Sequence, residues 1–147
     1  MSDQTARGYN AIQITYALTA AKLSKDELGA QSLLPEKPLD CLDALESTLV
    51  ACYLTLKELP ENGYNPIKLS KQLQNALAIV NNDSNDNGNL PLSTYLDGKK
   101  NSQYKDALLE LVTEFTHIWE ARWPQDGEAL GRAREVCAIN MQFSIKN

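Results

Sequence analysis

The chain has 147 residues, of which 43% are apolar and 22% are charged, and its formal net charge is −5. These values are typical of one globular domain that buries a core without disulfides or metals. The acidic balance argues against a general nucleic-acid coat protein, although it allows a local basic face. No apolar run approaches the roughly 20 residues that span a bilayer, and no signal-peptide pattern opens the chain. We therefore expect a cytoplasmic protein.

The three cysteines, Cys41, Cys52 and Cys137, indicate free thiols rather than a disulfide framework. Their number is odd, and there is no CxxC motif. Cys41 and Cys52 are eleven residues apart in one predicted helix, which places them on one face but roughly 16 Å apart. We expect small core residues in a reducing compartment.

The first predicted helix covers about residues 5–22. Its apolar side chains recur at helical spacing, which predicts a face packed against a core. Ser24 and Glu27 resemble a capping box, so a short extra turn is expected there, with Gly29 as its stop. A linker with two prolines is expected over residues 29–38. The apolar stripe consists of Tyr9, Ile12, Tyr16 and Leu23, widened by Ile14 and Leu18.

The second predicted helix has the most regular pattern in the chain. Asp40 is its expected N-cap, and Pro60 and Gly63 end it. Six apolar residues follow at steps of three and four, which is the spacing of a heptad repeat. Because the repeat lasts under three heptads, we favour a bundle core over a coiled-coil partner face. The six residues are Leu42, Leu45, Leu49, Cys52, Leu56 and Leu59.

A third helix is predicted to start at Asn65-Pro66, with proline in its first turn. A long loop follows over residues 81–101, where Asn, Asp, Pro and Gly replace the helical pattern. Loops of this length are uncommon in compact domains, and they are often functional or disordered. The residues expected to be buried in the third helix are Ile67, Leu73, Leu77 and Val80.

Two more helices complete the predicted fold. Ser102 is the expected cap of the fourth, Pro124 breaks it, and the fifth covers about residues 127–143. Strand signals are almost absent, so residues 1–147 are predicted to form one all-α bundle of about five helices. The inward residues are expected to be Leu108, Leu111, Phe115 and Ile118 in the fourth helix, and Leu130, Ala133, Val136, Cys137, Ile139 and Phe143 in the fifth.

The residue types that carry catalysis do not gather in a recognisable pattern. His117, the only histidine, lies between Phe115 and Trp119 in a predicted helix, and we expect it to be structural or partly exposed. Metal ligation is not expected, because structural zinc sites need four ligands, usually in close pairs. We therefore predict no enzyme activity, no metal and no cofactor. The carboxylates of Asp106, Glu110 and Glu114 share one helix face and are expected to be solvated.

The segment from Asp83 to Thr94 has partial similarity to a calcium-binding loop. Oxygen-bearing side chains stand at its first, third and fifth positions, and Gly88 stands at the sixth. However, Thr94 replaces the bidentate Glu expected at the last position, and Pro91 interrupts the approach to a second helix. We therefore favour a turn cluster of Asn and Asp residues over a calcium site.

Charge is divided between the predicted helices. The second helix is acidic, whereas the first helix and the third have no acidic residue between Gln4 and Lys25 or between Pro66 and Asn82. A helix face of Lys, Ser, Gln and Asn suits contact with a phosphate backbone without base readout. The alternative is a set of solvated lysines that pair with the acidic helix. The candidate nucleic-acid-binding residues are Arg7, Lys22, Lys25, Lys68, Lys71, Lys99, Lys100 and Lys105.

The chain resembles the small helical subunit of CRISPR effector complexes, or the equivalent C-terminal module of the large subunit. The resemblance lies in the expected five-helix architecture and in the opening segment Arg7-Gly-Tyr-Asn-Ala-Ile-Gln-Ile-Thr-Tyr-Ala17. It implies a non-catalytic subunit whose copies stack and hold single-stranded DNA or RNA through Lys and Arg. The implied partners are other subunits of the complex, nucleic-acid backbone and further copies of the chain, with no membrane.

A second hypothesis is a protein-interaction adaptor or inhibitor that binds no nucleic acid. Its contact surface would be an apolar helix groove or the acidic patch of Asp40, Asp43 and Glu46. Such a patch would meet a basic partner, for example as a mimic of phosphate.

Overall fold

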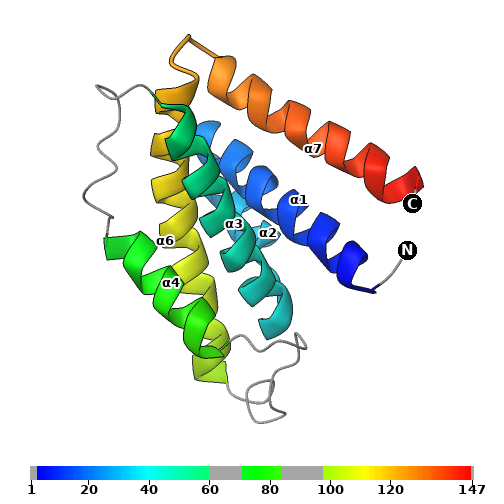
Figure 1. The fold of residues 1–147 in the computed structure, drawn as a ribbon, viewed down its shortest axis with the longest axis vertical. Coiled ribbons are helices and arrows are strands. Elements are labelled where there is room, and N and C mark those ends of the chain that lie inside the picture. Colours follow the sequence, from blue (N-terminus) through cyan, green and yellow to red (C-terminus); the bar gives the residue numbers. More distant parts are fainter. Residues whose placement is uncertain (1–2, 60–70, 84–97, 147) are drawn as a thin grey trace.

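The computed structural model describes residues 3–59, 71–83 and 98–146 (Figure 1). Within these ranges there are six helices and no strand, which confirms the predicted all-α class. None of the six is long and apolar enough to cross a membrane. The helices are α1 (Asp3–Leu23), α2 (Glu27–Leu33), α3 (Pro38–Glu58), α4 (Lys71–Asp83), α6 (Gly98–Arg122) and α7 (Glu128–Lys146).

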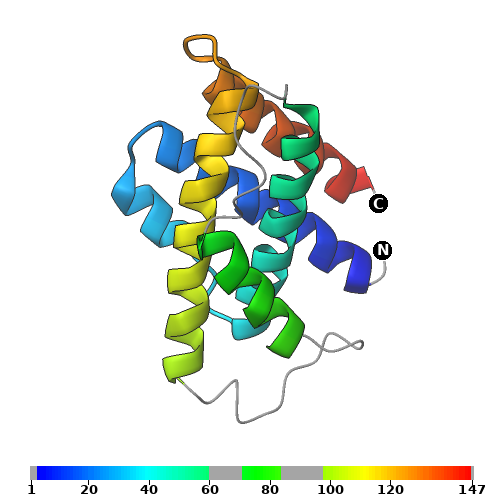
Figure 2. The same cartoon turned by 60° about the vertical axis from the view of Figure 1, so that its left-hand side comes forward.

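The helices α3 and α6 run side by side and form the centre of the bundle (Figures 1 and 2). The helix α4 packs across one side of this pair, and α1 crosses the other side. The helix α7 lies antiparallel beside α1, which brings the two ends of the chain close together. Because α3 and α7 each pack on α1 but have little or no contact with each other, both keep an uncovered side.

The predicted heptad residues of α3 form the core, as expected for a bundle. Leu42, Leu45, Leu49 and Cys52 are all buried, and they face α6 residues that are also buried. Side chains of this kind each contribute roughly 1.5–3 kcal/mol when they leave water. The buried apolar residues of α6 are Tyr104, Ala107, Leu108, Leu111, Val112, Phe115, Ile118 and Trp119.

Buried threonines contribute to the contact between α1 and α3. The Thr48 hydroxyl donates to the Ala44 carbonyl at 2.8 Å, so it is able to accept from the Thr15 hydroxyl, 3.0 Å away. Both threonines are fully buried. These bonds satisfy the buried hydroxyls, and the small side chains let the two helices approach closely.

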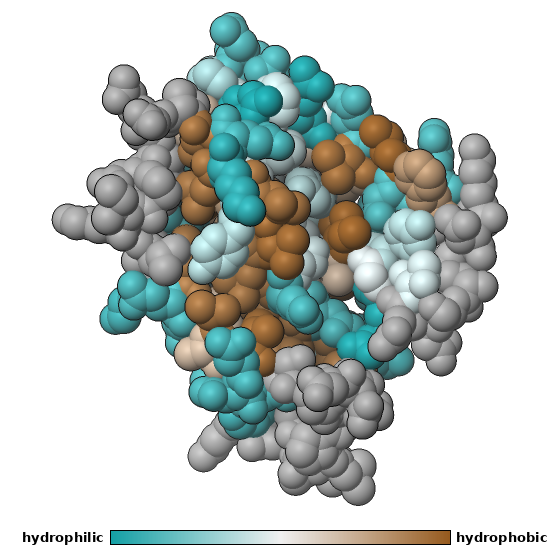
Figure 3. Space-filling view, in the orientation of Figure 1, coloured by the Kyte–Doolittle hydropathy of each residue, from teal (hydrophilic) through white to brown (hydrophobic). Residues whose placement is uncertain are grey.

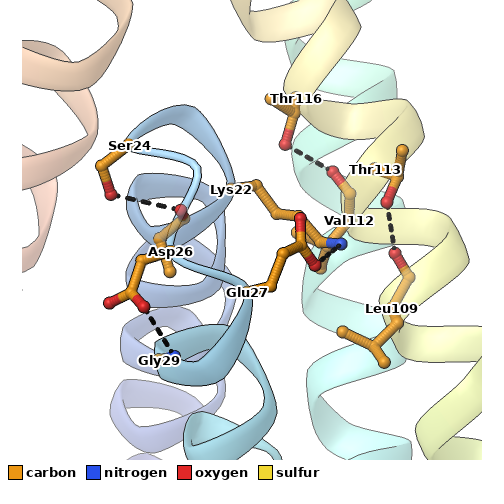
Figure 4. Close-up of polar contacts among 10 residues, drawn as sticks. Lys22, Ser24, Asp26, Glu27, Gly29, Leu109, Val112, Thr113 and Thr116 are labelled. Carbon is orange, nitrogen blue, oxygen red and sulfur yellow. Dashed lines mark hydrogen bonds and ion pairs between the residues drawn. The ribbon is translucent and has the colours of Figure 1, made fainter.

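A compact turn connects α1 to α2 (Figure 4). Lys25 adopts a left-handed backbone with φ of 59°, and its amide donates to the Lys22 carbonyl at 3.1 Å. The Asp26 amide donates to the Ala21 carbonyl at 2.9 Å, which completes a Schellman motif. The Asp26 carboxylate then caps α2 by accepting from the Gly29 amide at 2.9 Å.

This turn corrects three predictions about residues 24–38. Ser24 does not cap α2, because its hydroxyl donates back to the Ala20 carbonyl at 2.9 Å. Gly29 does not stop the helix but lies in its first turn, where a Cβ would collide with the Asp26 carboxylate. The expected linker over residues 29–38 is therefore largely helical, and the described residues contain six helices rather than five.

Other boundaries and orientations also differ from the prediction. The helix α3 begins at Pro38, with Lys37 rather than Asp40 as its N-cap residue, and α6 begins before Ser102. The expected loop over residues 81–101 is helical at both ends, within α4 and α6. The start at Asn65-Pro66, together with Pro60, Gly63 and Ile67, lies outside the described residues. Three side chains expected to face inward are substantially exposed, namely Leu77, Ile139 and Phe143.

Candidate interaction surfaces

Arg7, one of the predicted phosphate-binding residues, forms a two-pronged ion pair within the chain. Its Nε and Nη2 donate to the two carboxylate oxygens of Asp43 at 2.8 and 2.7 Å. Both side chains are partly buried, and the pair ties α1 to α3. Two-pronged pairs of this kind are among the stronger hydrogen-bonded contacts in proteins. A phosphate would therefore have to compete with Asp43 for this guanidinium.

Two other predicted cations also face carboxylates. The Lys22 ammonium lies 3.5 Å from Glu27 across the α1–α2 turn (Figure 4). The Lys100 ammonium lies 3.3 Å from Asp83, which also accepts a 2.8 Å hydrogen bond from the Tyr104 hydroxyl. Three of the predicted cations therefore form ion pairs within the chain, although only Arg7 pairs with the acidic helix α3.

The remaining predicted cations are distributed over separate elements. Lys25 is exposed in the α1–α2 turn, Lys71 is exposed as the first residue of α4, and Lys105 is half-buried on α6. None of these three forms an ion pair with residues 3–59, 71–83 or 98–146. Lys68 and the side chain of Lys99 lie outside what the structure describes. The six residues of this set whose side chains the structure describes thus lie on α1, the α1–α2 turn, α4 and α6.

The first position of the calcium-like segment is already occupied. The Asp83 carboxylate, which would be the first calcium ligand, binds Tyr104 and Lys100 instead. Residues 84–94 lie outside the described ranges. Among the described residues, no group of three or more His, Cys, Asp or Glu side chains is placed to hold a metal ion.

The histidine and the cysteines do not have the properties of catalytic groups. His117 is exposed on α6. Burial raises the pKa of the Cys52 thiol to about 12 and that of Cys41 to about 11, and burial also raises the pKa of Cys137. At neutral pH these thiols are therefore protonated and poorly nucleophilic.

The three carboxylates on one face of α6 are not all solvated. Asp106 and Glu110 are exposed, as expected, whereas Glu114 is half-buried. Its Oε1 is buried and has no hydrogen-bond partner among the described residues. The prediction of a solvated carboxylate is therefore wrong for Glu114, whose charge is near enough to Cys52 of α3 to contribute to the raised pKa of that thiol.

An aromatic and arginine cluster closes the end of the bundle where α6 turns into α7. The Trp119 indole donates to the Ala129 carbonyl at 2.8 Å, which fixes the start of α7. The guanidinium carbons of Arg122 and Arg132 lie 3.9 and 4.3 Å from the Trp123 ring centre. Arg122 also donates to Glu58 at 3.0 Å, which ties the turn to α3. Both arginines therefore have structural contacts within the chain.

The outer side of α3 exposes two large apolar side chains that were not predicted from the sequence. Val50 and Leu54 are 52% and 56% exposed, and they lie one turn apart. Glu46 precedes them by one turn, Lys57 follows, and both charged residues are exposed. We call these four residues the outer stripe. Their spacing of four, four and three residues places them on one side of a helix. The heptad pattern on the inner side of α3 is longer and more regular, so the sequence predicted only that side.

The predicted acidic patch is smaller than expected. Asp43 is neutralised by Arg7, and Asp40 is half-buried, so only Glu46 is fully available on that side of α3. The same side of the molecule shows brown, apolar surface over α3 and over the α1–α7 pair (Figure 3). On α7, Ile139 and Phe143 are 45% and 54% exposed. The most prominent feature of this face is therefore apolar, not acidic.

No family model, no curated protein and no solved structure matches the chain.

Proposed function

We propose that this protein is a non-catalytic, cytoplasmic interaction subunit that works by docking the outer stripe of α3 onto a protein partner. The observation that carries the proposal is the exposure of Val50 and Leu54 on a helix whose inner side is fully packed. Large apolar side chains grouped on the surface of a folded domain are typical of contact sites. The three free thiols fit a reducing compartment.

The distribution of charge supports protein contact over nucleic-acid contact. Backbone recognition needs several cations that are free to release counterions. Arg7, Lys22 and Lys100 instead face Asp43, Glu27 and Asp83. The centre of the stripe, Val50 and Leu54, is apolar, and its two charged residues stand at the ends, which suits a protein interface with an apolar core and a polar rim.

The proposal is tested by co-purification from the native host with a tagged chain. We expect Leu54→Glu to lose the co-purifying protein, because a charge would enter the centre of the contact. Leu28→Glu is the matched control, since Leu28 is 85% exposed on α2. Equal recovery of partners with the parent, Leu54→Glu and Leu28→Glu would rule out the outer stripe as the docking surface.

A second candidate function is backbone binding within a nucleoprotein complex such as a CRISPR effector. The observation in its favour is the solvent side of α4, where Lys71, Gln74 and Asn75 are exposed and no acidic residue occurs before Asp83. These three residues belong to the polar, acid-free face expected from the sequence, of which Lys68 and Ser70 lie outside the described residues. Membership of a CRISPR complex is a prediction supported only by the helical fold.

Anisotropy of a labelled single-stranded DNA or RNA separates the two candidates. Backbone binding predicts an affinity that falls steeply between 50 and 200 mM salt, roughly as a power of salt concentration. The pair Lys68→Ala and Lys71→Ala should weaken it, whereas Lys22→Ala, whose ammonium faces Glu27, should not. Unchanged binding by the double variant would exclude the α4 face.

A further inference from the structure

We infer that the outer stripe is covered by the same stripe of a second copy of the chain, packed antiparallel about a two-fold axis. This inference rests on the proposed function, because it names the partner of the same surface. The stripe is made of Glu46, Val50, Leu54 and Lys57, all exposed on α3.

The charges of the stripe are arranged so that it complements itself. Glu46 lies six residues before the midpoint between Val50 and Leu54, and Lys57 lies five residues after it. At 1.5 Å per residue these distances are about 9 and 7.5 Å along the helix axis. A two-fold rotation at the midpoint therefore brings Glu46 of each copy beside Lys57 of the other, while Val50 meets Leu54. Neither Glu46 nor Lys57 has an ion-pair partner in the described ranges of its own chain.

The surroundings of the stripe also suit an identical copy. Two chains that each carry a charge of −5 repel one another, so a contact between them is favoured where the facing surfaces are neutral and add no local repulsion. The stripe has one acid and one base, and the neighbouring Arg7–Asp43 pair adds no net charge. A neutral surface of this kind gives no advantage to a strongly basic or strongly acidic partner.

The spacing of the stripe fits a common mode of helix packing. Glu46, Val50 and Leu54 form a ridge at intervals of four residues. Two such ridges interdigitate at an interaxial angle of about −50° and a distance of about 8–10 Å. Long Glu and Lys side chains reach across this distance on either side of the crossing point.

The size of the contact predicts a weak dimer. The stripe extends about 17 Å from Glu46 to Lys57, taking 1.5 Å per residue. A contact of this length falls at the small end of specific interfaces, where complexes are transient. We therefore expect a dimer that forms with rising concentration and dissociates on dilution.

Sedimentation equilibrium of the purified full chain, from about 5 μM to about 1 mM, tests the inference. The parent should move from monomer toward dimer in this range, and Leu54→Glu should stay monomeric. Glu46→Lys and Lys57→Glu should each weaken the dimer roughly tenfold, because each replaces two opposite-charge contacts by two like-charge contacts. The double variant Glu46→Lys with Lys57→Glu should recover to within about threefold of the parent.

The recovery of the double variant is the decisive result, because it restores both pairs with their signs exchanged. Leu28→Glu on α2 is the control for added negative charge, and it should dimerise like the parent. Circular dichroism of each variant verifies the fold, since all four positions are exposed. A parent that stays monomeric at 1 mM, or a double variant no better than the singles, overturns the inference.

The outcomes also separate this inference from the proposed function. A monomeric parent whose Leu54→Glu variant still loses a different protein in the native host leaves the docking function intact and refutes the second copy. A stripe whose variants change neither assembly nor co-purification refutes both.

Discussion

Leu45 on the inner side of α3 and Leu54 on its outer side are the same residue type, nine positions apart in one helix. Leu45 is fully buried against α6, whereas Leu54 is 56% exposed. Burial of Leu45 stabilises the fold, while exposure of Leu54 contributes little to it. The difference shows that one helix carries two apolar sides, of which the inner one stabilises the fold and the outer one faces solvent.

The largest expected effect comes from removing side chains on the two sides of α3. Leu45→Ala should lower the free energy of unfolding by about 2–5 kcal/mol, because it leaves a cavity in the core. Leu54→Ala should change it by less than about 0.5 kcal/mol, as is usual for surface positions. Urea unfolding at micromolar concentration measures both. Similar losses for the two variants would show that the outer side also belongs to the folding core.

The inner side should also make the protein sensitive to alkali. Burial raises the pKa of Cys52 and of Cys41 from 9.0 to about 12 and about 11, and that of Tyr16 from 10.0 to about 12. Above pH 9 the unfolded chain loses the thiol protons while the folded chain keeps them. Stability is therefore fully present below pH 9 and is lost as the pH rises toward the folded pKa values.

The size of this loss can be measured on single thiols. At pH 10, Cys52 alone should account for about 1 kcal/mol of lost stability, from one unit of proton linkage. The urea midpoint of the parent should fall between pH 8 and pH 10. The fall should be smaller in Cys52→Ala, because the variant lacks this thiol. An equal pH slope in parent and variant would mean that Cys52 titrates normally in the folded chain.

The sequence determines the inner side of the bundle much better than the outer side. The heptad pattern of α3 identified Leu42, Leu45, Leu49 and Cys52 because burial repeats with the helical period. Val50 and Leu54 also recur at helical spacing, but spacing does not distinguish an apolar pair that stays exposed from one that is buried. Periodicity alone could not reveal which apolar residues stay exposed, since that depends on which helices cover which sides.

The candidate site was harder to predict for a related reason. Lysines and arginines on the sequence do not disclose their partners, and Arg7 meets Asp43 only after 36 residues of intervening chain fold. Six residues of α7 were likewise predicted to face inward. The helix packs on α1 alone along most of its length, so Ile139 is exposed. Long-range pairing and helix arrangement are properties of the fold rather than of local pattern.

A smaller difference in stability is expected between substitutions of the buried Trp119 and the partly exposed Trp123 at the end of α6. Trp119→Phe should lower stability by about 1 kcal/mol, because it removes the hydrogen bond to the Ala129 carbonyl. Trp123→Phe should cost less, since the Trp123 indole nitrogen has no hydrogen-bond partner in the part of the chain that the structure describes. Thermal unfolding of the two variants side by side makes the comparison. A larger loss for Trp123→Phe would show that the stacked arginines are the dominant contribution at this end.

The smallest effect concerns two backbone positions on the surface, where side-chain burial plays no part. Lys25 and Gly127 both have left-handed backbones, with φ of 59° and 76°. This conformation is costly for a residue with a Cβ and easy for glycine. Lys25→Gly should therefore raise stability by up to about 1 kcal/mol, whereas Gly127→Ala should lower it by a similar amount. Opposite shifts in the unfolding midpoint would show that these turns are limited by backbone geometry. If Lys25→Gly instead destabilised the chain, the contacts of the Lys25 side chain would have to stabilise the fold by more than its left-handed backbone costs.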